Sequence, residues 1–402
     1  MERAMWKRGL LAALLCAALC ASGAQAQVRF SPDATNMVTG ESVSVFSHGE
    51  EHGLTFDLSG RGYEVTDAAG ERMCWSAEAI EKDGFQADLL PRSLDEVRRM
   101  NRVMAYLNDY PLLDLHSTIN LKRDELLPVY AAPSEDAWRG QNGRAAVSLA
   151  APITVLSDPA DQDWWLIEYA TSGSERRIGY IRRPACSQFV AIGWWIIPMT
   201  LILQEDAPLT DDPHGGRREI ARFAAGEAVT VLGYYDGLWA YAQTQIDGKE
   251  ARGFLPLRAL AKPEEEPLPD VMAELTGAWT FFGGGEVLGL AGVIFERDGT
   301  LCACTTDDES VFPAERLIPG GKRTPYVVYA SPDRTYGEQY ALEVTHDDGR
   351  VTRYGLEWVD ASESRSGCDE LAVYHGYGGG FYRRMGEPEF EPKPEEEPDE
   401  GF

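Results

Sequence analysis

Alternating apolar and polar residues run through most of the chain and predict short β-strands. The clearest run, WWLIEYA at 164–170, is followed by a polar turn and a second alternating run that ends on Gly-Tyr-Ile at 179–181. A similar order recurs where LWAYAQT at 238–244 precedes the turn IDGKEA and Gly-Phe-Leu at 253–255. Period-two alternation places successive side chains on opposite faces of a strand, so both stretches predict half-buried antiparallel hairpins.

The two hairpins belong to a longer repeat. ITVL at 153–156 and VTVL at 229–232 precede them with an offset of 76 residues, and proline-bearing lead segments open the copies at 127–136 and 206–216. Each unit is about sixty residues long and predicts five short strands, which fits a small, partly open antiparallel barrel. Two copies at this spacing are too few for a propeller or a solenoid.

The order of lead strand, long loop, ITVL or VTVL strand, tryptophan strand and GYI or GFL strand resembles the bacterial SH3-like (SH3b) domain. The resemblance covers Leu126–Pro184 and Leu201–Ala261, about a third of the chain. It implies two small barrels that bind cell-wall peptidoglycan or another envelope peptide or glycan, and it implies no catalysis.

The aromatic residues of these units are the candidate ligand-binding residues, because flat rings offer apolar area to a peptide or sugar at a low cost in conformational entropy. The same rings also suit the core of so small a barrel, and the sequence does not decide whether Trp164 or Trp165 corresponds to Trp239. Tyr234 and Tyr235 precede a turn and are expected at the surface. The full set of candidates is Trp164, Trp165, Tyr169, Tyr180, Tyr234, Tyr235, Trp239 and Tyr241.

Alternation continues through residues 271–386, where the RDGT and HDDGR turns separate the runs. Seven or eight antiparallel strands are predicted, which form a closed barrel or a sandwich. The opening Leu-x-Gly-x-Trp at Leu275–Trp279 resembles the first strand of lipocalin-like barrels. Such a barrel either holds a small apolar ligand or is filled by its own side chains, and a filled interior is expected at this size.

Residues 27–125 predict an α+β region of unassigned role. Strands are expected at 41–47, 53–59 and 62–67, and a helix at 93–109, with Ser93 as its N-cap and Glu96 completing a capping box. The helix carries an apolar stripe, which is expected to pack on the neighbouring sheet and consists of Val97, Met100, Met104 and Leu107.

HGEEH at His48–His52 matches the His-x-x-Glu-His pattern of inverted zinc proteases. That chemistry needs both histidines on one helix face, whereas Gly49 and Gly53 interrupt this segment after a strand-like run. A hairpin turn is therefore the preferred interpretation, and no metal is expected. The sequence also lacks a Gly-x-Ser-x-Gly elbow and a phosphate loop. We expect no enzymatic activity and no cofactor.

Charge and targeting signals indicate where the protein is located and which partners are excluded. Residues 1–26 resemble a secretory signal peptide, with basic Arg3, Lys7 and Arg8 before an apolar run and small residues at Ala24 and Ala26. The full chain carries a net charge of −28, and removing residues 1–26 leaves −30. So acidic a protein is repelled by the phosphates of nucleic acids. No transmembrane span is expected, because no apolar run is long enough. Secretion to the extracellular space, with non-covalent attachment to the cell wall, is the predicted location.

Two acidic, proline-rich segments divide the chain. Residues 262–270 form a linker and residues 387–402 form a tail, and both are expected to be extended and mobile because they contain little apolar surface to bury. Five scattered cysteines after residue 26 are too few for a disulfide-stapled scaffold, so packing roles are expected for them.

The predicted fold is mainly β and multi-domain. Its parts are an N-terminal α+β region at 27–125, SH3-like barrels at 126–190 and 191–261, and a C-terminal antiparallel β-barrel or sandwich at 271–386. Three functional hypotheses follow: a secreted non-catalytic protein that binds the wall by avidity, an extracellular small-molecule carrier that uses the C-terminal barrel, and a hydrolase in the N-terminal region with SH3-like targeting modules. The choice of function rests on analogy with the resembled fold.

Overall fold

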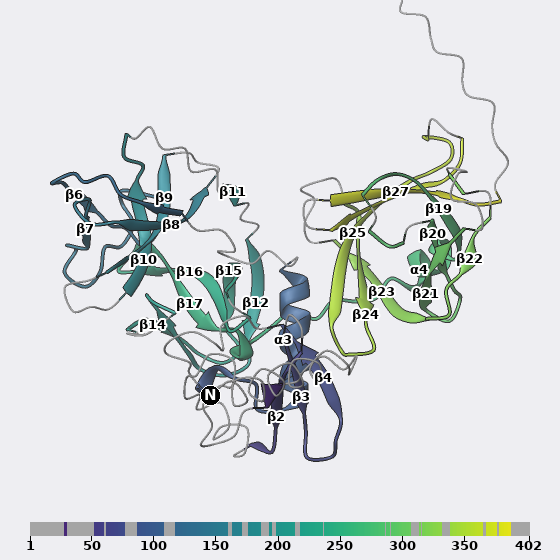
Figure 1. Ribbon diagram of the computed structural model, residues 1–402, viewed down its shortest axis with the longest axis horizontal. Coiled ribbons are helices and arrows are strands. Elements are labelled where there is room, and N and C mark those ends of the chain that lie inside the picture. The colour runs from purple at the N-terminus through teal and green to yellow at the C-terminus, as the bar shows by residue number, and fades with distance from the viewer. Residues whose placement is uncertain are drawn as a thin grey trace, which may run out of the picture.

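A computed structural model gives the fold of the chain (Figure 1). It describes residues 28–29, 52–59, 62–76, 87–107, 117–159, 163–170, 176–185, 193–194, 198–213, 218–235, 237–285, 287–289, 291–306, 313–314, 316–331, 338–364, 367–375 and 378–386. The signal-like segment, His48 and the acidic tail lie outside these residues. The fold is mainly β, as predicted. Within the described part, no helix is long and apolar enough to cross a membrane.

The N-terminal region contains a sheet in the order β1 (Val28–Arg29), β2 (Thr55–Ser59), β3 (Gly62–Thr66) and β4 (Arg72–Trp75). A short 3-10 turn, η2 (Ala87–Leu89), leads to the helix α3 (Leu94–Tyr106). The predicted apolar stripe of α3 is buried and contacts β4, which confirms its packing role.

The first repeat unit contains β6 (Leu126–Pro128), β7 (Ala146–Ser148), β8 (Ile153–Pro159), β9 (Trp164–Ala170) and β10 (Arg176–Arg182). Its main sheet has the order β10-β9-β8-β11, and β11 (Gly193–Trp194) pairs in parallel with β8. A further strand, β5 (Ser117–Ile119), also pairs with β8. Strands from both flanks of the repeat thus complete this sheet.

The second repeat unit forms a seven-stranded sheet with the order β14-β13-β17-β16-β15-β12-β18. Five strands were predicted for this unit, and the sheet has seven. Their bounds are β12 (Met199–Leu203), β13 (Ala207–Thr210), β14 (Glu219–Phe223), β15 (Ala228–Tyr235), β16 (Trp239–Ile246), β17 (Lys249–Pro256) and β18 (Leu260–Ala261), with a 3-10 turn, η3 (Leu257–Ala259), before the last strand.

The C-terminal module is a closed, eight-stranded, up-and-down antiparallel barrel. Neighbouring strands pair in sequence order, and the ring closes where the first strand pairs with the last. The strands are β19 (Gly277–Gly284), β20 (Gly292–Phe295), β21 (Thr300–Thr305), β23 (Thr324–Ala330), β24 (Tyr340–Thr345), β25 (Val351–Val359), β26 (Glu370–His375) and β27 (Gly378–Arg384), with β22 (Ile318–Pro319) added to β21. Of the two predicted architectures, the structure has the barrel.

The acidic segment 262–270 is seated between the second unit and this barrel. Lys262 Nζ lies 2.7 Å from Glu343 Oε1, and Glu265 receives two hydrogen bonds from the Arg353 guanidinium, at 2.8 and 2.9 Å. Its last two residues already belong to the helix α4 (Pro269–Leu275). The expectation of a mobile linker is therefore wrong, because buried charges on the barrel provide partners for its Lys and Glu.

Helix α3 lies in the centre of the molecule, between the repeat units and the barrel (Figure 1). Asn101 is 3% exposed and donates from Nδ2 to the carbonyls of Cys74, at 2.8 Å, and Gly349, at 3.1 Å. The Cys74 amide donates to the Asp348 carbonyl at 2.7 Å. These bonds attach the β24–β25 turn of the barrel to the N-terminal region.

Candidate functional site

Most of the predicted binding aromatics of the first unit are core residues. Trp165 and Tyr169 pack in the unit's own core with Ile167, as their shared strand face predicts. Trp164, on the opposite face, belongs to a larger core that the unit shares with the second unit and the N-terminal region. Trp165 is fully buried and Tyr169 is 8% exposed, so these two rings do not form an exposed groove.

Tyr180 and Tyr241 lie at the junction of the two units. Their hydroxyl oxygens are 3.5 Å apart, and Arg252 donates from Nη1 to the Tyr180 oxygen at 3.0 Å. Burial holds the pKa of Tyr241 well above its usual value. Nearby, burial also raises the pKa of Asp211, although the Arg177 guanidinium lies 3.4 Å away and opposes the shift. The junction is buried, and these contacts join the two units.

Tyr234 and Tyr235 end strand β15 and differ in exposure. Tyr234 is half-buried, whereas Tyr235 is 7% exposed and packs against Phe254, with 6.2 Å between ring centroids. The expectation of a surface position is therefore wrong for Tyr235. Its ring belongs to the core cluster of the second unit, with Leu238 and Trp239.

Strand register settles which tryptophans correspond. In the first unit Trp164 pairs with Arg182, the residue after Gly-Tyr-Ile, and in the second unit Trp239 pairs with Pro256, the residue after Gly-Phe-Leu. Trp164 is therefore the equivalent of Trp239. Trp165 corresponds to Ala240, so its role as a core residue is particular to the first unit.

Trp239 lines a pocket on the second unit with a volume of about 210 Å³. Strands β13, β14, β16 and β17 supply most of its wall, and Asp88 of η2, Arg258 of η3 and the β12–β13 turn supply the rest. The pocket combines one aromatic ring and two prolines with four carboxylates and one guanidinium. Its lining residues are Asp88, Glu205, Asp206, Ala207, Pro208, Thr210, Glu219, Trp239, Pro256 and Arg258.

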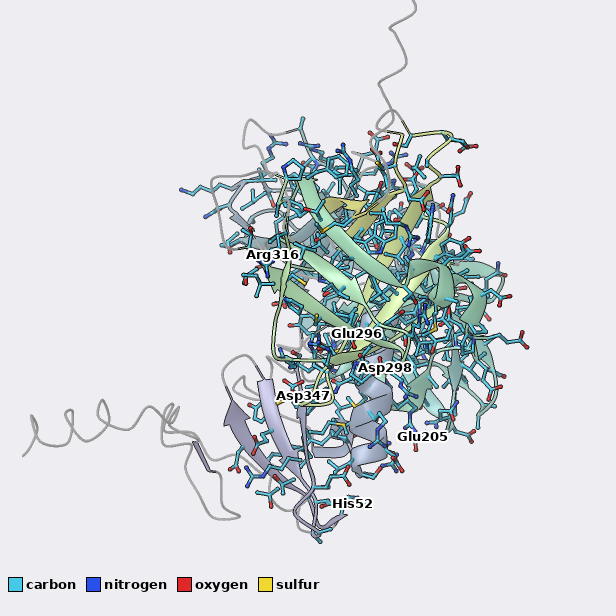
Figure 2. All side chains as sticks on the ribbon, turned by 90° about the vertical axis from the view of Figure 1, so that its right-hand side faces the viewer. His52, Glu205, Glu296, Asp298, Arg316 and Asp347 are labelled. Carbon is cyan, nitrogen blue, oxygen red and sulfur yellow. The ribbon has the colours of Figure 1, made fainter. Side chains whose placement is uncertain are left out.

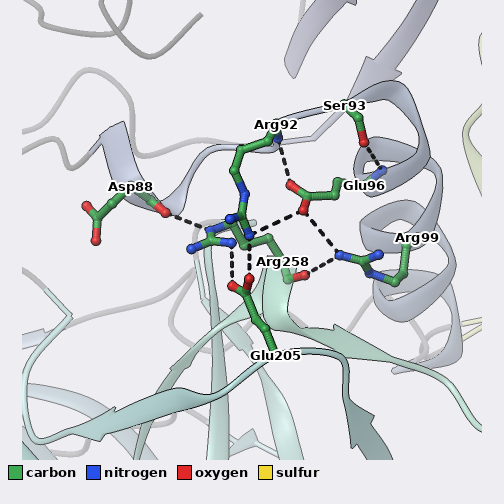
Figure 3. A network of polar contacts seen from close by, with 7 residues as sticks. All are labelled: Asp88, Arg92, Ser93, Glu96, Arg99, Glu205 and Arg258. Atoms are coloured by element: carbon green, nitrogen blue, oxygen red, sulfur yellow. Dashed lines mark hydrogen bonds and ion pairs between the residues drawn. The ribbon is translucent and has the colours of Figure 1, made fainter. Parts of the chain in front are cut away.

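A network of ion pairs stiffens one side of the pocket (Figure 3). Glu205 bridges two guanidinium groups, because Arg92 donates to its Oε2 at 2.6 Å and Arg258 donates to its Oε1. Arg258 also donates from Nε to the Asp88 carbonyl at 2.6 Å, and Arg99 donates to the Arg258 carbonyl at 2.7 Å. The N-terminal region and the second unit are thus joined at the pocket wall.

Two further carboxylates line the pocket. Asp206 is exposed, and its Oδ1 accepts the Ala225 amide at 2.9 Å. Glu219 is also exposed and pairs with Arg222 on its own strand at 2.5 Å. Trp239 is itself only 2% exposed, so the pocket presents prolines and carboxylates rather than the face of the ring. A concave site of this kind is suited to a small ligand that carries a hydrogen-bond-donating group.

Sequence reasoning found Trp239 but missed every other residue of the pocket. Asp88, Glu205 and Arg258 are far apart in the sequence, and no motif connects them. Pro256 did carry a signal, because it follows Gly-Phe-Leu where the first unit has Arg182 after Gly-Tyr-Ile.

Among the residues that the structure describes, the barrel interior is filled by large side chains that are at most 8% exposed, among them Trp279, Phe295, Tyr326 and Tyr382. Trp279 donates from Nε1 to the Leu275 carbonyl at 2.8 Å, and the Arg384 guanidinium stacks 4.5 Å from the centre of its ring. These contacts close the end of the barrel next to α4, so the predicted filled interior is observed.

Most of the His48–His52 motif lies outside the residues that the structure describes. His48 lies outside the described residues, and His52 is exposed at the outer end of the N-terminal sheet (Figure 2). Among the described residues, no group of three or more His, Cys, Asp or Glu side chains is arranged to hold a metal ion. Cys302 and Cys304 are free buried thiols, and burial beside Cys302 raises the pKa of Cys304 to about 12, which makes a reactive thiolate unfavourable.

Comparisons with known proteins add little to this site. No protein-family model and no curated protein matches the chain. Among solved structures, NlpC1 from Trichomonas vaginalis is similar at 10% identity, over 76% of this chain and 99% of that chain, with a TM-score of 0.19. NlpC2 from the same organism shares 11% identity, over 60% of this chain and 97% of that chain, with a TM-score of 0.18. Scores this low carry no argument about function.

Proposed function

We propose that this protein is an exported, non-catalytic binding protein whose SH3-like repeat units hold a peptide or glycan of the cell envelope. The observation that carries the proposal is the pocket over Trp239. It places two prolines, several polar groups and a tryptophan that is 2% exposed around a small concave space on the second unit. Such a combination of apolar area with a few oriented polar groups is typical of ligand sites.

The rigid setting of the pocket also supports binding. The ion pairs of Glu205 with Arg92 and Arg258 hold one wall against the N-terminal region, and the tyrosine junction fixes the second unit against the first. A wall that is already ordered loses little conformational entropy when a ligand enters. Non-catalytic binding requires only such an ordered wall and no catalytic group.

The carrier hypothesis receives no such support, because the space inside the barrel is occupied by its own aromatic and aliphatic side chains. The hydrolase hypothesis depends on His48 and His52, and the first of these lies outside the described residues. We therefore keep envelope binding as the function that the geometry favours.

Co-sedimentation of the chain without residues 1–26 with purified peptidoglycan sacculi tests the proposal. The unmodified protein should pellet with the sacculi. Glu219→Trp places bulk at the exposed rim of the pocket and should weaken binding about ten-fold, the effect of losing a principal contact. Gln245→Trp is the matched control, since it adds the same ring at an exposed position of β16 outside the pocket, and it should pellet as the unmodified protein does.

A protein that stays in the supernatant with sacculi would overturn envelope-wall binding. Equal pelleting of both tryptophan variants would show that the wall is bound elsewhere on the chain. Circular dichroism of both variants establishes that any loss is not a loss of folding.

A further inference from the structure

Cys302 and Cys304 are two residues apart on strand β21, and both are free thiols. Leu301 on the same strand belongs to the interior cluster of the barrel and pairs with Phe295 of that cluster. Because side chains alternate along a strand, the two cysteines share the outer face of the barrel. They are nevertheless only 1% and 2% exposed, so something outside the barrel covers them.

The segment that ends in β22 covers this part of the outer face. Pro319 of β22 pairs with Cys304 from one side, and Gly292 of β20 pairs with Cys304 from the other. An added Cβ at Gly292 would lie 2.9 Å from Leu317 Cδ1, so the covering segment is in close contact with the sheet here. The two thiols are therefore enclosed between the sheet and this segment.

The two thiols are also partners of one another. Cys304 Sγ lies 3.7 Å from the Cys302 carbonyl oxygen, and the side chain of Cys302 is a hydrogen-bond partner of the Cys304 thiol. Burial most strongly disfavours ionisation of Cys304, and Cys302 adds to this. Arg323, which also pairs with Glu296 at 2.5 Å, and a hydrogen bond with the Gly320 backbone favour the ionised sulfur. Groups that stabilise a bound thiolate are thus already beside it.

The spacing of the two cysteines decides how they are joined most easily. Residues two apart on a strand have Cα atoms about 6.8 Å apart, and side chains that stand perpendicular to the sheet keep the Cβ atoms at a similar separation. A disulfide requires Cβ atoms about 3.5–4.5 Å apart, so it would pull β21 out of its pairing with β20. Two metal–sulfur bonds in line place the sulfurs about 4.6 Å apart, compared with about 2.05 Å in a disulfide. The spacing favours a bridging metal ion.

Two sulfur ligands without a third determine the kind of ion. Structural zinc ions take four ligands, and the described residues contain no group of three His, Cys, Asp or Glu side chains that would hold a metal. Calcium and magnesium need oxygen ligands, which a thiol pair does not offer. Cu(I) is a soft ion that thiolates select, and it is stable with two sulfur ligands in line.

We infer that Cys302 and Cys304 form a two-coordinate site for Cu(I) on the outer face of the barrel, beneath the segment that ends in β22. Each thiol releases its proton to water as its sulfur binds, so two S–H bonds break, two Cu–S bonds form, and the copper remains Cu(I). The ion supplies the positive charge that a free thiolate in this buried place would lack. The site is on the barrel and the pocket is on the second unit, so the inference does not depend on the proposed function.

Anaerobic titration of the reduced chain without residues 1–26 tests the inference, with Cu(I) presented as its bicinchoninate complex. The unmodified protein should withdraw one Cu(I) per chain from the coloured complex. Cys302→Ser combined with Cys304→Ser should lose this ion. Cys74→Ser combined with Cys368→Ser is the matched control, because it removes the other two free cysteines among the described residues, and it should still bind one Cu(I).

X-ray absorption at the copper edge gives a second measurement, which needs only the unmodified protein and decides the matter if the Cys302→Ser/Cys304→Ser variant fails to fold. The bound copper should have two sulfur neighbours and no nitrogen or oxygen neighbour. Circular dichroism shows whether each variant is folded.

A protein that withdraws no Cu(I) from bicinchoninate would overturn the inference, and so would equal withdrawal by the Cys302→Ser/Cys304→Ser variant. Copper with three or more sulfur neighbours, or with nitrogen or oxygen neighbours, would also overturn it. A Cys302–Cys304 disulfide in protein purified without reductant would contradict the argument from strand spacing. None of these results bears on pelleting with sacculi, which tests the proposed function separately.

Discussion

Gly253 shows how a single position is fixed by the fold. It lies on β17 beside β13, where an added Cβ would meet the Thr210 carbonyl oxygen at 2.5 Å and Leu209 Cγ at 3.0 Å. Gly179 has the same relation to Tyr130 and Val129 in the first unit. The glycine of the repeated Gly-aromatic-aliphatic pattern is thus required by the close approach of two backbones.

Gly253→Ala should lower the free energy of unfolding by about 1–3 kcal/mol, the usual cost of overpacking a site whose neighbour is backbone and cannot move aside. Gly321→Ala is the control, since a Cβ there meets nothing within 4 Å. Urea denaturation followed by tryptophan fluorescence gives both values. Equal stability of the two variants would mean that the strands separate at little cost.

Burial of the aromatic residues is also decided position by position. Trp164 and Trp165 are neighbours in one alternating run, yet one packs in the shared core and the other inside the first unit. The pattern of the sequence separates their faces. It does not say which face meets another unit, because that depends on a surface contributed by residues far away in the chain.

At the scale of elements, helix α3 was predictable in detail. Ser93 caps it by accepting the Glu96 amide at 3.2 Å, and the Glu96 carboxylate reaches back to the Arg92 amide at 2.7 Å, one residue before the N–H of a standard capping box. Glu96 also contacts the Arg92 and Arg99 guanidinium groups at 3.3 and 3.6 Å. The start of the helix is therefore tied to the residues that stiffen the pocket wall (Figure 3).

Ser93→Ala should destabilise the protein by about 1 kcal/mol through loss of the N-cap hydrogen bond. Ser93→Asp retains an acceptor and should keep nearly full stability. Thermal unfolding monitored by circular dichroism at 222 nm measures both. A Ser93→Asp variant as unstable as Ser93→Ala would show that the hydroxyl acts through another contact.

At the scale of the whole molecule, a buried ion-pair network joins the acidic segment 262–270 to the barrel. Arg353 is 4% exposed and donates to Glu265 and Glu343, and its guanidinium lies 5.0 Å from the centre of the Tyr106 ring at the end of α3. Burial alone would raise the pKa of Glu265, but its hydrogen bonds and charge interactions with Arg353 and Lys262 outweigh burial and lower the pKa below the ordinary 4.5.

This shift predicts a loss of stability in acid. Because the pKa of Glu265 is lower in the folded protein than in the unfolded chain, its contribution is fully present above about pH 4.5 and is lost as the pH falls through the folded-state value. Melting temperatures between pH 3 and pH 6 should fall more steeply for the unmodified protein than for Glu265→Gln, which has no carboxyl to protonate. Parallel curves would exclude Glu265 from the acid response.

The sequence by itself determined the local structure of this protein: the strands, the capped helix, the repeat and the run of hairpins in the C-terminal module. These follow from residue periodicity and turn chemistry, which act between near neighbours in the chain. Only the tertiary structure decided that the C-terminal strands close into a barrel and not a sandwich, that the acidic segment 262–270 pairs with the barrel, and that Asp88, Glu205 and Arg258 meet beside Trp239. The physical reason is that burial and ion pairing depend on contacts between residues far apart in the chain. The local alternation of apolar and polar residues does not specify those contacts.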